Sequence, residues 1–186
     1  MRRFQRFIER HASARRLIVL VALLAMAMLS VHVIDTPWSL VRLRSMTGGL
    51  GILDMELHYS GRHAYDLLTA LGPGGRSFYL WRMLAALDVV LPVLFAAVLS
   101  VGMAVGFRGL IGEQSRIRRL QVLPLIALAA DYSENVLIAF LLLRFPVEHS
   151  RIAALAGWVT TTKQLAYAAS IIVCIAAGAA RWRTHR

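Results

Sequence analysis

Four long apolar segments recur along the chain, separated by stretches rich in polar and charged residues. Each is long enough to cross a hydrocarbon core of about 30 Å as an α-helix. The segments cover residues 17–34, 80–107, 120–143 and 158–180. The pattern predicts an all-α fold: a membrane-embedded four-helix bundle over residues 17–180, between a basic N-terminal segment (1–16) and a basic C-terminal tail (181–186).

The connection between the first two apolar segments, residues 35–79, is too long to be a simple turn and should contain structure of its own. Ser60 is suited to N-cap a helix that reaches Leu71, and the glycine-rich run at 72–75 should end that helix. We therefore expect a partly helical extracytoplasmic loop that rests on the outer face of the bundle.

Composition and charge support membrane residence and give it an orientation. Hydrophobic residues make up 58% of the chain and charged residues 17%, whereas about 25% is charged in soluble domains. The net charge of +11 follows the topology and does not require nucleic acid, because arginines concentrate in the segments assigned to the cytoplasm. These arginines are Arg2, Arg3, Arg6, Arg10, Arg15, Arg16, Arg108, Arg116, Arg118, Arg119, Arg181, Arg183 and Arg186. The prediction is a multi-pass protein of a bacterial inner membrane, with both termini cytoplasmic and membrane lipids as its partners.

The sequence offers no established catalytic or metal-binding motif. Cys174 is the only cysteine, which excludes a dithiol redox mechanism. Asp54, Glu56 and His58 alternate in an extended segment and could supply metal ligands, but a solvated face is the simpler interpretation. We therefore expect no cofactor and no metal. Asp131→Asn and Glu134→Gln should impair assembly or ligand response far more than changes at Asp54 or Glu56.

The most informative feature is a set of polar residues inside the apolar segments. Asp131, Glu134 and Asn135 lie at positions i, i+3 and i+4, which share one face of a helix. Counting 1.5 Å per residue places polar groups of three helices in one layer, roughly 8 to 18 Å below the outer boundary. The predicted interhelical cluster comprises Asp88, Asp131, Glu134, Asn135, Lys163, Gln164 and Tyr167.

Charge counting restricts how this cluster is neutralised. Lys163 is the only lysine of the chain and can pair with one of Asp88, Asp131 and Glu134. The remaining acids must be protonated, hydrated or bound to something else. Two interpretations stay open: a structural network that fixes helix register, or a site for a small ligand or cation.

Two alternatives assign the chain another kind of function. Arg76 and Arg82, near the start of the second apolar segment, could hold a lipid head group for a membrane enzyme, although interfacial anchoring is the simpler role. A proton-coupled carrier or channel is the other alternative.

Gly102 and Gly106 have the GxxxG spacing of close helix contacts, and small-residue faces of this kind could also hold a homo-oligomer. We favour a protein without catalytic residues.

Three short motifs in order give the chain a family resemblance. They are Gly75-Arg76-x-x-Tyr79, then Asp88 followed by Pro92, then Asp131-x-x-Glu134-Asn135. In this order they resemble an uncharacterised family of small bacterial four-span integral membrane proteins, over roughly residues 54–146. The resemblance implies a four-helix architecture and no particular activity.

Overall fold

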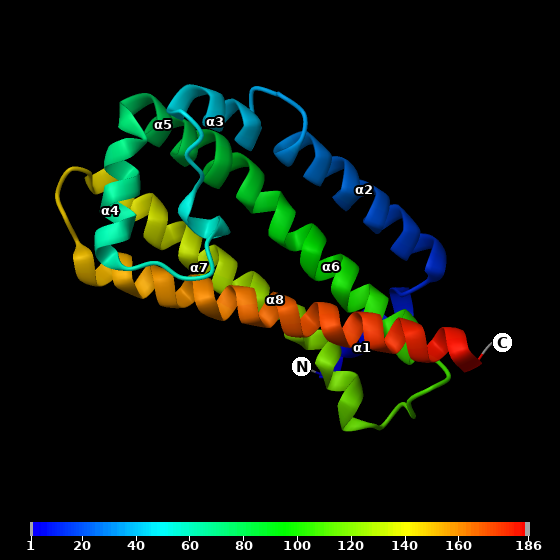
Figure 1. Cartoon of the computed structure of the whole chain (residues 1–186). Helices are drawn as coiled ribbons and strands as arrows, with labels where there is room; N and C mark the ends of the chain where they lie inside the picture. The colour runs from blue at the N-terminus through cyan, green and yellow to red at the C-terminus, as the bar shows by residue number, and fades with distance from the viewer. Residues whose placement is uncertain (1, 185–186) are drawn as a thin grey trace.

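The computed structural model describes residues 2–184, and within them the regular structure is helical (Figure 1). Four helices are long and apolar enough to cross a membrane, as the sequence predicted. They are Ala14–His32, Gly72–Phe107, Arg116–Arg144 and Ser150–Thr184. The chain is thus compatible with a polytopic membrane protein.

The four long helices are built from named segments and joined by shorter elements. The first long helix is α2 (Ala14–His32), and the fourth is α8 (Ser150–Thr184). The second consists of α5 (Gly72–Phe78), the π-helical η2 (Tyr79–Leu87) and α6 (Asp88–Phe107). The third consists of η3 (Arg116–Val122) and α7 (Leu123–Arg144). The shorter elements are α1 (Arg2–His11), α3 (Leu40–Thr47), η1 (Leu53–Met55) and α4 (Gly61–Ala70).

The long helices pack around α6, which contacts α2, α7 and α8, while α7 and α8 also pack on each other. Elements α3, α4 and α5 gather at one end of the molecule, which we call the loop end (Figure 1). Helix α1 and the C-terminal end of α8 lie at the opposite end, which we call the terminal end. Because α2 packs mainly on α6, most of its surface is exposed.

The glycine-rich run differs from its predicted role. Ser60 does cap α4, since its hydroxyl accepts from the backbone N–H of His63 at 3.2 Å, and α4 ends at Ala70. A new helix then begins at Gly72, eight residues before the predicted start of the second apolar segment. Pro73 permits this because a proline near a helix start gives up an N–H that would have no partner there. The glycine-rich run therefore follows the end of α4 and also forms the first residues of α5.

Gly102 and Gly106 allow α6 and α8 to touch toward the terminal end. A Cβ added at Gly102 would lie 2.6 Å from the sulfur of Cys174, and one at Gly106 would lie 2.7 Å from the Cβ of Ala177. Both distances are shorter than van der Waals contact. This small-residue face is therefore occupied within the chain.

Helix α1 is docked at the terminal end. Ile8 and Ala12 are buried against Ala104 of α6. Burial disfavours ionisation of Glu9, but hydrogen bonds from neighbouring side chains and the charge of Arg118, 3.2 Å away, outweigh it and lower the pKa of that carboxyl. The N-terminal segment is thus held by apolar packing, by the Glu9–Arg118 pair and by hydrogen bonds from Arg108 to the carbonyls of Glu9 and Ala12.

Pro92 explains why α7 carries an asparagine opposite α6. A proline has no N–H, so Pro92 cannot donate to the carbonyl of Asp88 four residues earlier. The side-chain amide of Asn135 donates to that carbonyl at 3.4 Å, and the hydroxyl of Tyr132 donates to the next carbonyl, that of Val89, at 2.7 Å. Neighbouring helices must supply such partners where water is absent.

We predict that Asn135→Leu destabilises the protein by about 1 kcal/mol and that most of this cost disappears in a Pro92→Ala background, because alanine restores the missing N–H donor. The measurement is a double-mutant cycle of equilibrium unfolding in mixed micelles. An equal cost of Asn135→Leu in both backgrounds would show that the amide does not serve this carbonyl.

Candidate functional site

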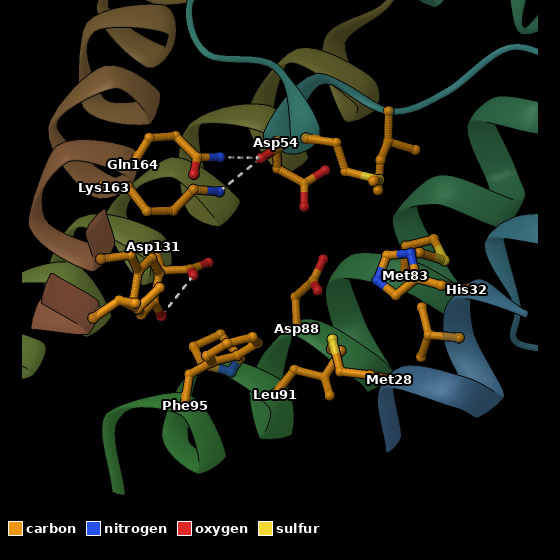
Figure 2. A pocket seen from close by; sticks show the side chains of 16 residues that line it. Met28, His32, Asp54, Met83, Asp88, Leu91, Phe95, Asp131, Lys163 and Gln164 are labelled. Carbon is orange, nitrogen blue, oxygen red and sulfur yellow. Dashed lines mark hydrogen bonds between the residues drawn. The ribbon is translucent and has the colours of Figure 1, made fainter. Parts of the chain in front are cut away.

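A cavity of about 360 Å³ lies beneath η1, between α2, α6, α7 and α8 (Figure 2). Its lining includes acids, a lysine and a histidine together with methionine, leucine and aromatic side chains. The lining residues are Met28, Val31, His32, Ile52, Asp54, Met55, Met83, Asp88, Leu91, Pro92, Phe95, Asp131, Lys163, Gln164, Tyr167 and Ile171. The volume is in the usual range of small-molecule sites, about 300 to 1,000 Å³.

Three carboxyl groups from three different segments face this cavity. Figure 2 shows Asp54 of η1, Asp88 of α6 and Asp131 of α7 pointing toward the same space. Within residues 2–184 none of the three forms an ion pair. The Oδ2 atom of Asp88 is buried and, among the described residues, has no hydrogen-bond partner. A buried carboxyl oxygen of this kind is costly unless something else satisfies it.

Asp54 lies in the cavity, which corrects the prediction of a solvated face. The buried Tyr79 donates its hydroxyl to Oδ1 of Asp54 at 3.1 Å and accepts from the backbone N–H of Leu53 at 3.1 Å. These contacts fold η1 inward, so one carboxyl of the alternating motif lines the cavity. Glu56 keeps the predicted surface role and pairs with His63 at 2.8 Å.

The segment around η1 is also tied to α8. Nζ of Lys163 donates to the backbone carbonyl of Asp54 at 3.0 Å, and the hydroxyl of Thr161 donates to that of Leu57 at 3.1 Å. Gly157 faces the carbonyl of Tyr59 so closely that any Cβ would collide with it. Element η1 is thus fixed from α8 as well as from Tyr79.

The only lysine pairs with Glu134. Nζ of Lys163 lies 2.5 Å from Oε2 of Glu134, and Thr160 donates its hydroxyl to Oε1 at 2.5 Å. Glu134 is 0% exposed and stands behind the cavity wall, not in its lining. Burial raises the pKa of the neighbouring Tyr59 phenol, so this group stays neutral beside the pair. The pair leaves no lysine for the three aspartates.

Asp131 is held in position by neutral partners. Tyr167 donates its hydroxyl to Oδ2 of Asp131 at 3.1 Å, and the amide of Asn135 lies 3.5 Å from Oδ1. The Tyr167 ring in turn packs on Phe95, with 5.6 Å between centroids. Asp131 therefore has a fixed orientation without a cation.

The structure divides the seven predicted cluster residues. Five line the cavity: Asp88, Asp131, Lys163, Gln164 and Tyr167. Glu134 lies behind the wall, and Asn135 lies on the α6–α7 side, next to the backbone that Pro92 leaves open. The predicted cluster thus consists mainly of cavity-lining residues, and the ion pair of Lys163 with the buried Glu134 lies at the cavity wall.

Arg76 and Arg82 both contact protein groups. Arg76 donates to the carbonyl of Leu68 at 2.8 Å and lies over the ring of Phe145, 3.9 Å from its centroid. Arg82 lies over the ring of Trp38, 4.5 Å from its centroid. These contacts hold elements of the loop end against each other. Head-group binding by either arginine stays a prediction.

The apolar half of the cavity was missed by the sequence analysis. Met28 comes from α2, Leu91 and Phe95 from α6, and Ile171 from α8. In an apolar helix nothing in the sequence separates such residues from lipid-facing ones. His32 of α2 lies on the wall opposite Asp131 (Figure 2) and is the one polar side chain that α2 contributes.

The carboxyl groups do not form a compact metal-ligand set. Within residues 2–184, no group of three or more His, Cys, Asp or Glu side chains lies close enough to hold a metal ion. The three aspartates face the cavity from three separate segments.

Comparisons with protein-family models, with curated proteins and with solved structures found no match to this chain. The resemblance to a four-span bacterial family therefore stays a prediction, and the site must be interpreted from its own chemistry.

We predict that Glu134→Gln destabilises the protein by about 3 to 5 kcal/mol, because it leaves the buried ammonium of Lys163 without its counter-ion. Glu56→Gln, which breaks an exposed pair with His63, should cost less than about 1 kcal/mol. Equilibrium unfolding in mixed micelles measures both. The double variant Glu134→Gln with Lys163→Met should recover part of the loss, and a double variant no more stable than Glu134→Gln alone would contradict the assignment.

Proposed function

We propose that this chain is a multi-pass protein of a bacterial inner membrane whose cavity binds a small organic cation, such as an amine. The loop end faces outward and both termini are cytoplasmic in this proposal, in agreement with the distribution of arginines. The four long helices form a membrane bundle, and η1 with α4 belongs to its extracytoplasmic loop. No catalytic residue is assigned.

One observation carries the proposal: the buried carboxyl of Asp88 has an oxygen without a hydrogen-bond partner and faces a cavity shared with Asp54 and Asp131. A cation with N–H donors would hydrogen-bond to the part of the Asp88 carboxyl that lines the cavity. Charge-assisted hydrogen bonds of this type are stronger than neutral ones.

The cavity also selects for size and polarity. Its volume of about 360 Å³ exceeds what a bare ion needs. Below the three carboxyls the lining is apolar, with Leu91 and Phe95 on the α6 side. The arrangement suits a molecule with an ammonium group at one end and a hydrocarbon part at the other.

Packing favours a binding site over a transport path. Toward the terminal end, α6 and α8 touch at Gly102 and Gly106, where even a Cβ has no room. A proton-coupled carrier would need a polar route past this contact. Proton-dependent amine flux in vesicles that is lost in Asp131→Asn would favour the carrier.

The test measures, by calorimetry, the binding of n-butylammonium to the protein in lipid nanodiscs. Asp88→Asn keeps the size of the side chain and replaces the ionisable carboxyl by a neutral amide, so Kd should rise at least about tenfold, given about 1.5 to 3 kcal/mol for a hydrogen bond to a charged group.

The matched control is Asp66→Asn, because Asp66 is an exposed acid on α4 outside the cavity. This control should bind as the wild type does. Equal affinity of wild type and Asp88→Asn, or no binding to either, would overturn the proposal.

A further inference from the structure

We infer that the occupant of this cavity is a single-chain alkylammonium amphiphile that enters sideways from the bilayer, between α2 and α8. This inference rests on the proposed function and adds the class of ligand and its route. It depends on the shape of the cavity, on where its polar groups lie, and on what closes its outer end.

The cavity is a groove with two walls that do not pack closely on each other. Helices α2 and α8 both contribute lining residues, yet α2 packs chiefly on α6, and α8 packs chiefly on α7 and then on α6. In Figure 2, α2 and α8 stand on opposite sides of the space, with α6 below and η1 above. Ile171 of α8 lines the groove and is itself 39% exposed, so the groove reaches the protein surface at this edge of α8.

Polarity changes along the groove. Asp54, Lys163 and Gln164 lie at the η1 end. Ile171 also lines the groove. It lies eight residues after Lys163 along α8, which corresponds to about 12 Å at 1.5 Å per residue. The ammonium group of a ligand would lie among the polar side chains at the η1 end, and its alkyl group would lie along the apolar side chains toward Ile171.

The outer end is closed by η1. Lys163 and Gln164 both donate to the carbonyl of Asp54, and Tyr79 holds the Asp54 carboxyl. An aqueous ligand would have to break these bonds to enter from the loop end. A ligand already in the bilayer meets no such barrier at the side.

The helix surfaces next to the opening are suited to lipid. Leu29 of α2 is 50% exposed and Ile172 of α8 is 67% exposed, although neither lines the groove. Their neighbours in the sequence, Met28 and Ile171, do line it. On each wall a lining residue and its sequence neighbour outside the lining thus form a matched pair for a test.

The experiment uses dodecylammonium with a photoreactive diazirine in mid-chain, incorporated into nanodiscs that contain the full-length protein. Labelled peptides are identified by mass spectrometry. The expected labels fall on α2 and α8. Ile171→Trp and Met28→Trp fill the groove, and labelling should fall about tenfold in each because the larger side chain takes the place of the alkyl chain. Ile172→Trp and Leu29→Trp are the controls and should label as the wild type does.

Binding of n-butylammonium to the wild-type protein separates this inference from the proposed function, because this ligand carries the ammonium group without a long chain. Unfolding in mixed micelles, compared with that of the control variants Ile172→Trp and Leu29→Trp, shows that the two groove variants are folded, and the groove variants lie on different helices. Equal labelling in all four variants, or labels away from α2 and α8, would overturn the lateral route and leave the proposed function standing. Absence of butylammonium binding to wild type would overturn both.

Discussion

The ion pair between Glu134 and Lys163 determines most of what surrounds it. It uses the only lysine of the chain, and the same ammonium group donates to the backbone carbonyl of Asp54. One side chain thus neutralises a fully buried acid and holds η1 over the cavity. Since no second lysine exists, Asp54, Asp88 and Asp131 face the cavity without a cationic partner among the described residues. The charge of the site is a consequence of that pairing.

The parts of this arrangement that follow helix periodicity were predictable from the sequence. The four apolar helices are found where long apolar segments lie, and the spacing of Asp131 and Glu134 does place both side chains on the inner side of α7. The sequence could not decide which acid takes Lys163, because the three candidates lie at similar depths and only packing ranks them. It also misplaced Asp54, since its position depends on a hydroxyl 25 residues away, that of Tyr79.

Polar residues inside these helices perform two different tasks, and the distinction changes how the site is interpreted. Asn135 serves the backbone that Pro92 leaves without a donor, so an amide that looked like part of a binding cluster has a structural explanation. Thr160 also has a structural role, because its hydroxyl donates to the buried carboxylate of Glu134. Asp88 has no such explanation, because one of its carboxyl oxygens meets no donor in residues 2–184. A ligand is therefore best sought at Asp88.

The central claim is that the carboxyl of Asp88 receives the ammonium group of the ligand. Infrared difference spectroscopy in nanodiscs tests it directly, because carboxylic acid and carboxylate groups absorb at separate frequencies. Addition of n-butylammonium should produce a carboxyl difference band that is absent from Asp88→Asn and retained in Asp66→Asn. A difference spectrum that is the same in wild type and Asp88→Asn would contradict the account.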